Sequence, residues 1–279
     1  MDEIVLVLGG GGARGLAHVG VIRALEEGGV RVHAIAACSM GGIVGAFLAS
    51  GADADRMEAV AREIRYADLL AFGEVGGVVG GDGIATVLRR YLPDRFEDLN
   101  VPLSLTAVDV QRGELVILRD GPLVPALRAT SALPGLIAPV EHEDRLLVDG
   151  GLLNNLPVDV GRTLARRPVV AVDVAVPPDR SLALDGDKSA WSRLREWVQP
   201  QRAALTGLFM KSFDIPQALV TRMRLTMTPP DVLIRPALDT EFGVEQFGRI
   251  DEALAAGYDA GRGALAALRD GASPPAPEE

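Results

Sequence analysis

A serine that could act as a nucleophile stands where an apolar segment gives way to a helix rich in small residues. Residues 35–42 read IAACSMGG, which is the pattern G-x-S-x-G with Ala37 in the place of the first glycine. In such a strand-to-helix turn the central residue, here Ser39, points outward beside the first free N–H groups of the helix. Ala37 and Gly41 must be small because the strand and the helix pass close together. The pattern predicts a catalytic serine, with an ordinary N-capping serine as the alternative.

A glycine-rich segment lies one strand before this serine. The apolar strand Ile4–Leu8 runs into GGGGARG at residues 9–15, and a helix follows to about Glu27. Consecutive glycines let several N–H groups converge on one anionic oxygen, and the helix dipole favours negative charge there. The segment also fits the G-x-G-x-x-G of dinucleotide-binding folds, in which the second strand should end in an acidic residue. Here the strand 30–37 ends in Cys38-Ser39, so the sequence favours an oxyanion hole over a pyrophosphate site.

A serine hydroxyl needs a base, and an aspartate later in the chain is the first candidate. Asp149 ends the apolar segment 145–149 and is followed by Gly150 and Gly151. An aspartate in that position is expected to point into a cleft. A turn aspartate is the alternative interpretation, because Asp-Gly is common in turns.

The three histidines of the chain offer a second candidate base, in a Ser-His-Asp triad. The chain order Ser39, Asp109, His142 would suit an α/β-hydrolase. In that fold several strands precede the nucleophile, whereas a single earlier strand is predicted here. His142 also lies in an acidic surface turn, His33 inside a strand and His18 on the buried side of its helix. The carboxylate of the aspartate in the DGG segment is the better candidate.

Three motifs in this order resemble the patatin-like phospholipases in their short bacterial form. They are GGGGARG at residues 9–15, ACSMGG at 37–42 and DGG at 149–151, together with the segments ATSALPG and LLNNLPVD. The resemblance covers roughly Ile4–Ala175, with a weaker likeness over Ile234–Tyr258. One of these motifs would be weak by itself, but three in the family's order are specific.

The resemblance implies a three-layer α/β sandwich, with a mostly parallel sheet and helices on both faces, that hydrolyses acyl esters of lipids. It implies that Ser39 is the nucleophile and Asp149 the base, and that no cofactor or metal takes part. The N–H groups of three glycines would form the oxyanion hole with an arginine nearby: Gly10, Gly11, Gly12 and Arg14. Five residues would support the motifs: Gly15, Ala37, Gly41, Gly150 and Gly151. Ala37 departs from the family's pattern, and we expect its methyl group to be tolerated.

Two other functions are kept as hypotheses. A catalytically silent relative acting as a regulator or scaffold is the second hypothesis, and a dinucleotide-binding protein is the third.

Composition predicts a soluble globular protein. The chain has 279 residues, of which 48% are hydrophobic and 24% charged, and no apolar stretch reaches the roughly 20 residues of a membrane span. The start of the chain lacks a basic leader, so we expect a cytoplasmic protein that is at most peripheral at the membrane.

The net charge of −10 argues against nucleic acid as a partner but allows transient membrane-surface contact through an apolar patch. A single cysteine, Cys38, excludes an internal disulfide and disfavours structural zinc. The expected partner is a lipid or acyl-ester substrate, and the oligomeric state is unknown from the sequence.

We expect one hydrolytic domain over residues 1–270 and a disordered tail over 271–279. Residues 178–228, which include Trp191 and Trp197, gather tryptophan, methionine and phenylalanine. They are interpreted either as helices packed on the sheet or as a helical lid that touches lipid. The remaining elements expected are helices over 40–50, 53–70, 83–92 and 244–270, a loop over 73–83, a hairpin of 101–110 with 114–118, and strands over 168–176 and 232–235.

Overall fold

The computed structural model describes residues 3–64, 74–75, 78–79, 82–175, 200–239, 242–244 and 246–270. Its centre is an eight-stranded sheet with the strand order β10-β9-β1-β2-β5-β8-β7, in which β6 also pairs with β5. The five strands from β10 to β5 are parallel, whereas β6, β7 and β8 join antiparallel. The strands are β1 (Glu3–Leu8), β2 (Arg31–Ala37), β5 (Leu103–Asp109), β6 (Glu114–Leu118), β7 (Val140–His142), β8 (Arg145–Asp149), β9 (Val169–Val172) and β10 (Val232–Ile234).

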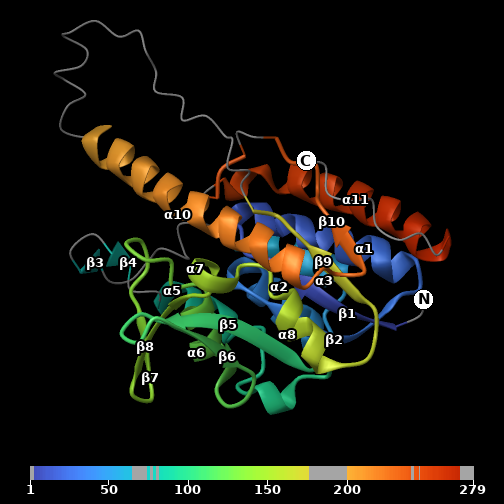
Figure 1. Ribbon diagram of the computed structural model, residues 1–279, viewed down its shortest axis with the longest axis horizontal. Coiled ribbons are helices and arrows are strands. Elements are labelled where there is room, and N and C mark those ends of the chain that lie inside the picture. Colours follow the sequence, from blue (N-terminus) through green and yellow to red (C-terminus); the bar gives the residue numbers. More distant parts are fainter. Residues whose placement is uncertain are drawn as a thin grey trace, which may run out of the picture.

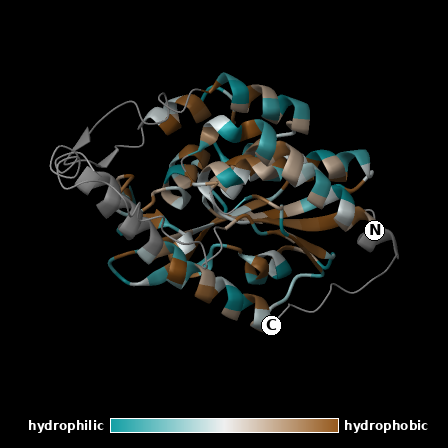
Figure 2. Cartoon of the chain, turned by 90° about the horizontal axis from the view of Figure 1, so that it is seen from above, coloured by the Kyte–Doolittle hydropathy of each residue, from teal (hydrophilic) through white to brown (hydrophobic). Residues whose placement is uncertain are grey.

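Helices cover both faces of this sheet (Figure 1). The side chains of β1 alternate between two hydrophobic cores, one on each face of the sheet. Ile4, Leu6 and Leu8 pack in the larger core, together with residues of α1, α2, α3, α6 and α11. Val5 and Val7 pack in the smaller core, together with residues of α8. Figure 2 shows the hydrophobic strands running through the centre between the helices. The helices are α1 (Ala17–Glu27), α2 (Ser39–Ala49), α3 (Ala54–Glu63), α5 (Asp82–Leu88), α6 (Leu123–Thr130), α7 (Gly151–Asn154), α8 (Val158–Leu164), α10 (Pro200–Met227) and α11 (Ile250–Asp270), with 3-10 turns η1 (Gly12–Leu16), η2 (Phe96–Asp98) and η3 (Phe247–Arg249).

The predicted fold class is confirmed, since the sheet is mostly parallel and has helices on both faces. The predicted hairpin is confirmed as β5 and β6, with Gly113 at a φ of 68° in its turn. Several predicted elements were wrong in extent: the helix expected over 83–92 ends at Leu88, and the strand expected over 168–176 ends at Val172. The helix expected to begin at residue 53 ends at Glu63, the loop expected over 73–83 contains the short hairpin of β3 (Glu74–Val75) and β4 (Val78–Val79), and the last helix begins at Ile250 after η3. The segment 178–199 of the expected lid, with both tryptophans, and the expected tail over 271–279 lie outside the described residues.

Candidate active site

Ser39 occupies a strained turn between β2 and α2. It is the first residue of α2 and has a φ of 52°, a left-handed conformation that is unfavourable for a residue with a side chain. The helix passes so close to β1 that a Cβ atom on Gly41 would lie 2.3 Å from the carbonyl oxygen of Leu8. Ala37 lies one residue before the turn's N-cap, as the buried last residue of β2, where a methyl group is accommodated in the core. The close approach therefore demands glycine at position 41 and only a small residue at position 37.

Asp149 reaches the level of Ser39 from the opposite direction. In the parallel pair of β2 and β5, Ala37 lies opposite Leu105, and in the antiparallel pair of β5 and β8, Asp149 lies opposite Ala107. Ala107 is two residues beyond Leu105, just as Ser39 is two residues beyond Ala37. The register thus places the end of β8 level with the serine, with β5 between them.

Two glycines let the chain cross β5 after Asp149. A Cβ atom on Gly150 would lie 2.4 Å from the carbonyl oxygen of Thr106 on β5, so a side chain would push the segment away from the sheet. The N–H of Gly151 donates a hydrogen bond of 2.8 Å to Oδ1 of Asp149. The DGG motif therefore both brings the carboxylate close to β5 and orients it.

Asp149 is buried and only 4% exposed. Ser39 and this carboxylate line the same end of one cavity, and Cys38 Sγ donates to Oδ1 at 3.5 Å. Removal from water raises the pKa of Asp149 from 3.8 to about 6, because the favourable interactions with Gly151, Ser39 and Cys38 offset only part of the desolvation. Burial raises the pKa of the Cys38 thiol well above its usual value, so the thiol keeps the proton that it donates. The arrangement places a serine hydroxyl next to a carboxylate whose basicity has been increased.

The glycine-rich loop lies beside Ser39, since a Cβ atom on Gly10 would lie 2.9 Å from the Cβ of Ser39. The N–H of Gly10 donates to the carbonyl oxygen of Asn155 at 3.2 Å. Within the described part of the chain, the N–H groups of Gly11 and Gly12 donate to no protein acceptor. Of the three donors expected from the sequence, two are therefore free to bind an anionic oxygen.

Close packing behind the loop explains its glycines. A Cβ atom on Gly11 would lie 2.8 Å from the carbonyl oxygen of Val174, and one on Gly12 would lie 2.4 Å from that of Val244. Gly12 also has a φ of 55°, which favours glycine. These backbone contacts hold the two free N–H groups in place.

Arg14 and His18 also hold this loop. The buried Arg14 guanidinium donates to the carbonyl oxygens of Val174 at 2.9 Å and Phe242 at 3.0 Å, which ties the loop to the end of β9 and to the later chain. Nε2 of His18 lies 2.8 Å from the carbonyl oxygen of Gly9, and burial lowers the pKa of His18 to about 4. The neutral imidazole thus fixes the start of the loop.

Two polar residues of the site had no predicted role. Thr130 Oγ1 accepts the N–H of Ser39 at 2.9 Å and donates to the carbonyl oxygen of Thr106 at 2.7 Å. Asn155, which is 1% exposed, donates from Nδ2 to the carbonyl oxygen of Gly10 at 3.1 Å. Thr130 lies in the ATSALPG segment and Asn155 in the LLNNLPVD segment. A polar side chain among apolar neighbours is the sequence signal that could have indicated a role in the site.

The alternative triad is not assembled. Asp109 is the last residue of β5, and the Arg112 guanidinium in the turn that follows holds the pKa of its carboxyl below the usual value. His142 lies on β7, the last strand in the sheet order, where it is paired in register with Arg145 of β8. His33 is exposed near the start of β2. Neither histidine lines the pocket into which Ser39 opens.

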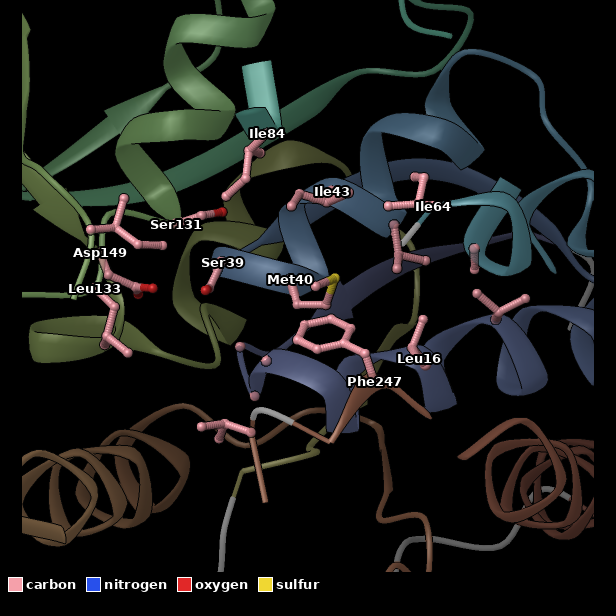
Figure 3. A pocket seen from close by; sticks show the side chains of 18 of the residues that line it. Leu16, Ser39, Met40, Ile43, Ile64, Ile84, Ser131, Leu133, Asp149 and Phe247 are labelled. Carbon is pink, nitrogen blue, oxygen red and sulfur yellow. The ribbon is translucent and has the colours of Figure 1, made fainter. Parts of the chain in front are cut away.

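Ser39 and Asp149 open into a cavity of about 840 Å³. Its polar end is formed by these two residues, the glycine-rich loop and Asn155. Figure 3 shows Ser39 and Asp149 near one end, with apolar side chains extending away from them. Those side chains come from η1 and from α1, α2, α3 and α5, and include Leu16, Val19, Met40, Ile43, Val44, Phe47, Met57, Val60, Ile64, Ile84, Val87 and Leu88. The cavity can hold a large apolar group next to the serine.

The chain is similar to known proteins in sequence and in fold. The chain is 30% identical over 280 residues to human patatin-like phospholipase domain-containing protein 6, covering 94% of this chain and 20% of that protein. It is 31% identical over 288 residues to lysophospholipase nte1 of Aspergillus fumigatus, covering 98% of this chain and 19% of the fungal protein. The chain thus spans about a fifth of the length of these curated relatives. The crystal structure of VipD from Legionella pneumophila shares the fold, with a TM-score of 0.56 and 16% identity over 95% of this chain and 67% of that one.

The family model for patatin-like phospholipases matches residues 6–161. The matched range is more than half of the chain and includes the glycine-rich loop, the serine turn and the DGG segment. The chain belongs to the patatin-like phospholipase family.

Proposed function

We propose that this protein is a serine acyl hydrolase that cleaves ester-linked lipids, of the phospholipase or lysophospholipase type. The observation that carries the proposal is the position of the Ser39 side chain next to the buried Asp149 carboxylate, at the polar end of a large apolar cavity (Figure 3). The printed names of the relatives, a phospholipase-domain protein and a lysophospholipase, support the same substrate class.

In the first step, Ser39 Oγ attacks the ester carbonyl carbon while Asp149 takes the hydroxyl proton. Negative charge develops on the carbonyl oxygen, where the free N–H groups of Gly11 and Gly12 would donate to it. Asp149 then returns the proton to the leaving alcohol oxygen as the ester bond breaks. The products of this step are the free alcohol and an acyl ester on Ser39.

In the second step, water attacks the acyl ester and Asp149 takes a proton from that water. The bond between the acyl carbon and Ser39 Oγ breaks, and the proton returns to Oγ, which releases a fatty acid. A pKa of about 6 makes Asp149 a better base than an exposed aspartate while leaving it ionised at neutral pH. The raised pKa therefore supports a mechanism without histidine.

The roles of the other predicted residues follow from their contacts. We assign the oxyanion hole to Gly11 and Gly12, and give Gly10 and Arg14 the supporting role of holding the loop. The accommodated methyl group of Ala37 and the intact Ser39–Asp149 pair favour an active enzyme over a silent scaffold. The apolar cavity and the serine at the end of β2 also disfavour dinucleotide binding.

The relation of the protein to membranes is a separate part of the proposal. None of the described helices is long and apolar enough to cross a bilayer. Transient contact with a lipid surface fits a substrate that resides in membranes. The cytoplasmic location, the short bacterial form, the single domain over residues 1–270 and the lid over 178–228 remain predictions.

Labelling with a fluorophosphonate probe tests the proposal. The wild-type protein should gain one covalent adduct by intact mass, and Ser39→Ala should gain none and lose hydrolysis of short acyl esters. Ser131→Ala is the matched control, because Ser131 is a buried serine of the same cavity and should be dispensable for labelling (Figure 3). An unlabelled wild type would favour the silent or nucleotide-binding alternative, and labelling that depends on Ser131 would refute the assignment of the nucleophile.

A further inference from the structure

The helix α10 has a side that faces the protein and a side that faces solvent. Phe213 and Gln217 line the cavity, and Leu225 packs against the smaller core with α8. These positions are separated by four and by eight residues, so they lie along one side of the helix. Figure 1 shows α10 crossing the outside of the molecule and extending past its edge. The inner side of α10 is thus one wall of the site.

The outer side of α10 carries large hydrophobic residues exposed to solvent. Ile215, Leu219, Met223 and Met227 are spaced by four residues and are between 51% and 81% exposed. Two other large hydrophobic residues are comparably exposed within the described ranges, Val110 and Ile117, and both lie at the hairpin of β5 and β6. We call the four residues on α10 the outer stripe. Scattered exposed residues are normal, whereas an aligned set of this kind marks an interaction surface.

The charge of α10 differs from that of the whole chain. The chain has a net charge of −10, whereas residues 200–227 contain four basic residues and one acidic residue. Arg224 is paired with Asp159, but Arg222 is exposed between Leu219 and Met223. An exposed row of leucine, isoleucine and methionine beside an exposed arginine suits contact with an anionic lipid surface.

We propose that the outer stripe docks on a phospholipid bilayer, so that lipid is taken up next to the cavity wall that α10 forms. The exposed Arg222 would meet lipid phosphates while the stripe enters the acyl boundary. Because a helix is about 10 Å across, the bilayer would lie about one helix diameter from the cavity. Docking stands independently of catalysis, whereas the delivery of substrate rests on the proposed function.

Flotation with vesicles of phosphatidylcholine and phosphatidylglycerol tests the docking surface. The substitutions are Leu219→Ser with Met223→Ser, which remove apolar contact without adding negative charge, and Leu219→Asp with Met223→Asp. The matched control is Val110→Ser with Ile117→Ser, which removes the other exposed hydrophobic pair. Hydrolysis is measured on a water-soluble short-chain ester and on phospholipid in the same vesicles.

We expect wild type and the hairpin control to float with the vesicles, and both stripe variants to lose binding by at least about tenfold. The stripe variants should hydrolyse vesicle phospholipid correspondingly more slowly and the soluble ester at the wild-type rate. Wild-type protein that does not float, or stripe variants that float equally, would overturn the proposal. A stripe-dependent dimer without flotation would also overturn it and make a second copy the occupant.

Failure of the proposed function has a different signature. A protein that floats through the stripe but hydrolyses neither ester would retain the docking surface and refute the hydrolase. Ser39→Ala should float like wild type, because this substitution leaves the outer stripe intact.

Discussion

Replacing Asp149 with asparagine should inactivate the enzyme and stabilise its fold at neutral pH. Asparagine has nearly the same shape, and its Oδ1 can still accept the N–H of Gly151. It cannot take a proton from Ser39, so turnover should fall by about 10³-fold or more. It also removes a negative charge from a site that is 4% exposed.

The stabilisation follows from the pKa of the buried carboxyl. The pKa is raised from 3.8 to about 6, and the difference of about 2.2 corresponds to about 3 kcal/mol. Below about pH 3 the carboxyl is neutral in both the folded and the unfolded chain, so burial of the charge has no cost. Between about pH 4 and pH 6 the unfolded chain ionises this group while the folded chain keeps it protonated, so the free energy of unfolding falls, and the loss is complete once the folded chain also ionises above about pH 6. Asp149→Asn avoids that loss.

Urea unfolding of both proteins at several values of pH measures this effect. The free energy of unfolding of Asp149→Asn minus that of wild type should increase by about 3 kcal/mol between about pH 3 and pH 7. The change with pH isolates the charge, because differences in packing between the two proteins are present at every pH. The same raised pKa predicts that wild-type kcat/KM falls on the acidic side of about pH 6. A stability difference that does not vary with pH would refute the buried carboxylate, and retained turnover would refute its role as base.

Two further substitutions test the rest of the site. Gly11→Ala should lower kcat by about 10²- to 10³-fold in a folded protein, because the new Cβ would lie 2.8 Å from the carbonyl oxygen of Val174 and displace an oxyanion donor. An unchanged rate would move the oxyanion hole elsewhere. His142→Ala should leave ester hydrolysis within several-fold of wild type; a folded but inactive variant, with Asp149→Asn still active, would restore the triad.

Local sequence patterns were sufficient for the parts of the site that depend on backbone shape. Glycine at position 41 is demanded by a carbonyl oxygen 2.3 Å from where its Cβ would lie, and the glycine-rich loop is crowded in the same way. Such close backbone contacts can be recognised in the sequence, because few residue types other than glycine fit at these positions. Parallel pairing of β1 and β2 then follows from a strand, a helix and a second strand in succession.

Side-chain contacts between segments that are distant in the chain could not be predicted from the local sequence. The roles of Thr130 and Asn155 depend on hydrogen bonds to Ser39 and Gly10, which lie 91 and 145 residues away in the chain. Arg14 was expected near the oxyanion, yet its guanidinium binds carbonyl oxygens of residues 174 and 242. An arginine in a glycine-rich loop has the same local pattern in either role, so the distinction required the positions of the later segments.

The sequence by itself determined the mostly parallel sheet, and it predicted Ser39 as the nucleophile and Asp149 as the base. Local sterics and burial restrict which residues can form a tight turn or a buried strand, so these features are visible in the sequence. Only the tertiary structure decided that β8 runs antiparallel to β5 and ends with Asp149 opposite Ala107. It also decided that burial raises the pKa of that carboxyl to about 6, and that the outer stripe of α10 stays exposed. Strand direction, desolvation and exposure depend on which distant segments pack together, and no local pattern of residues specifies that packing.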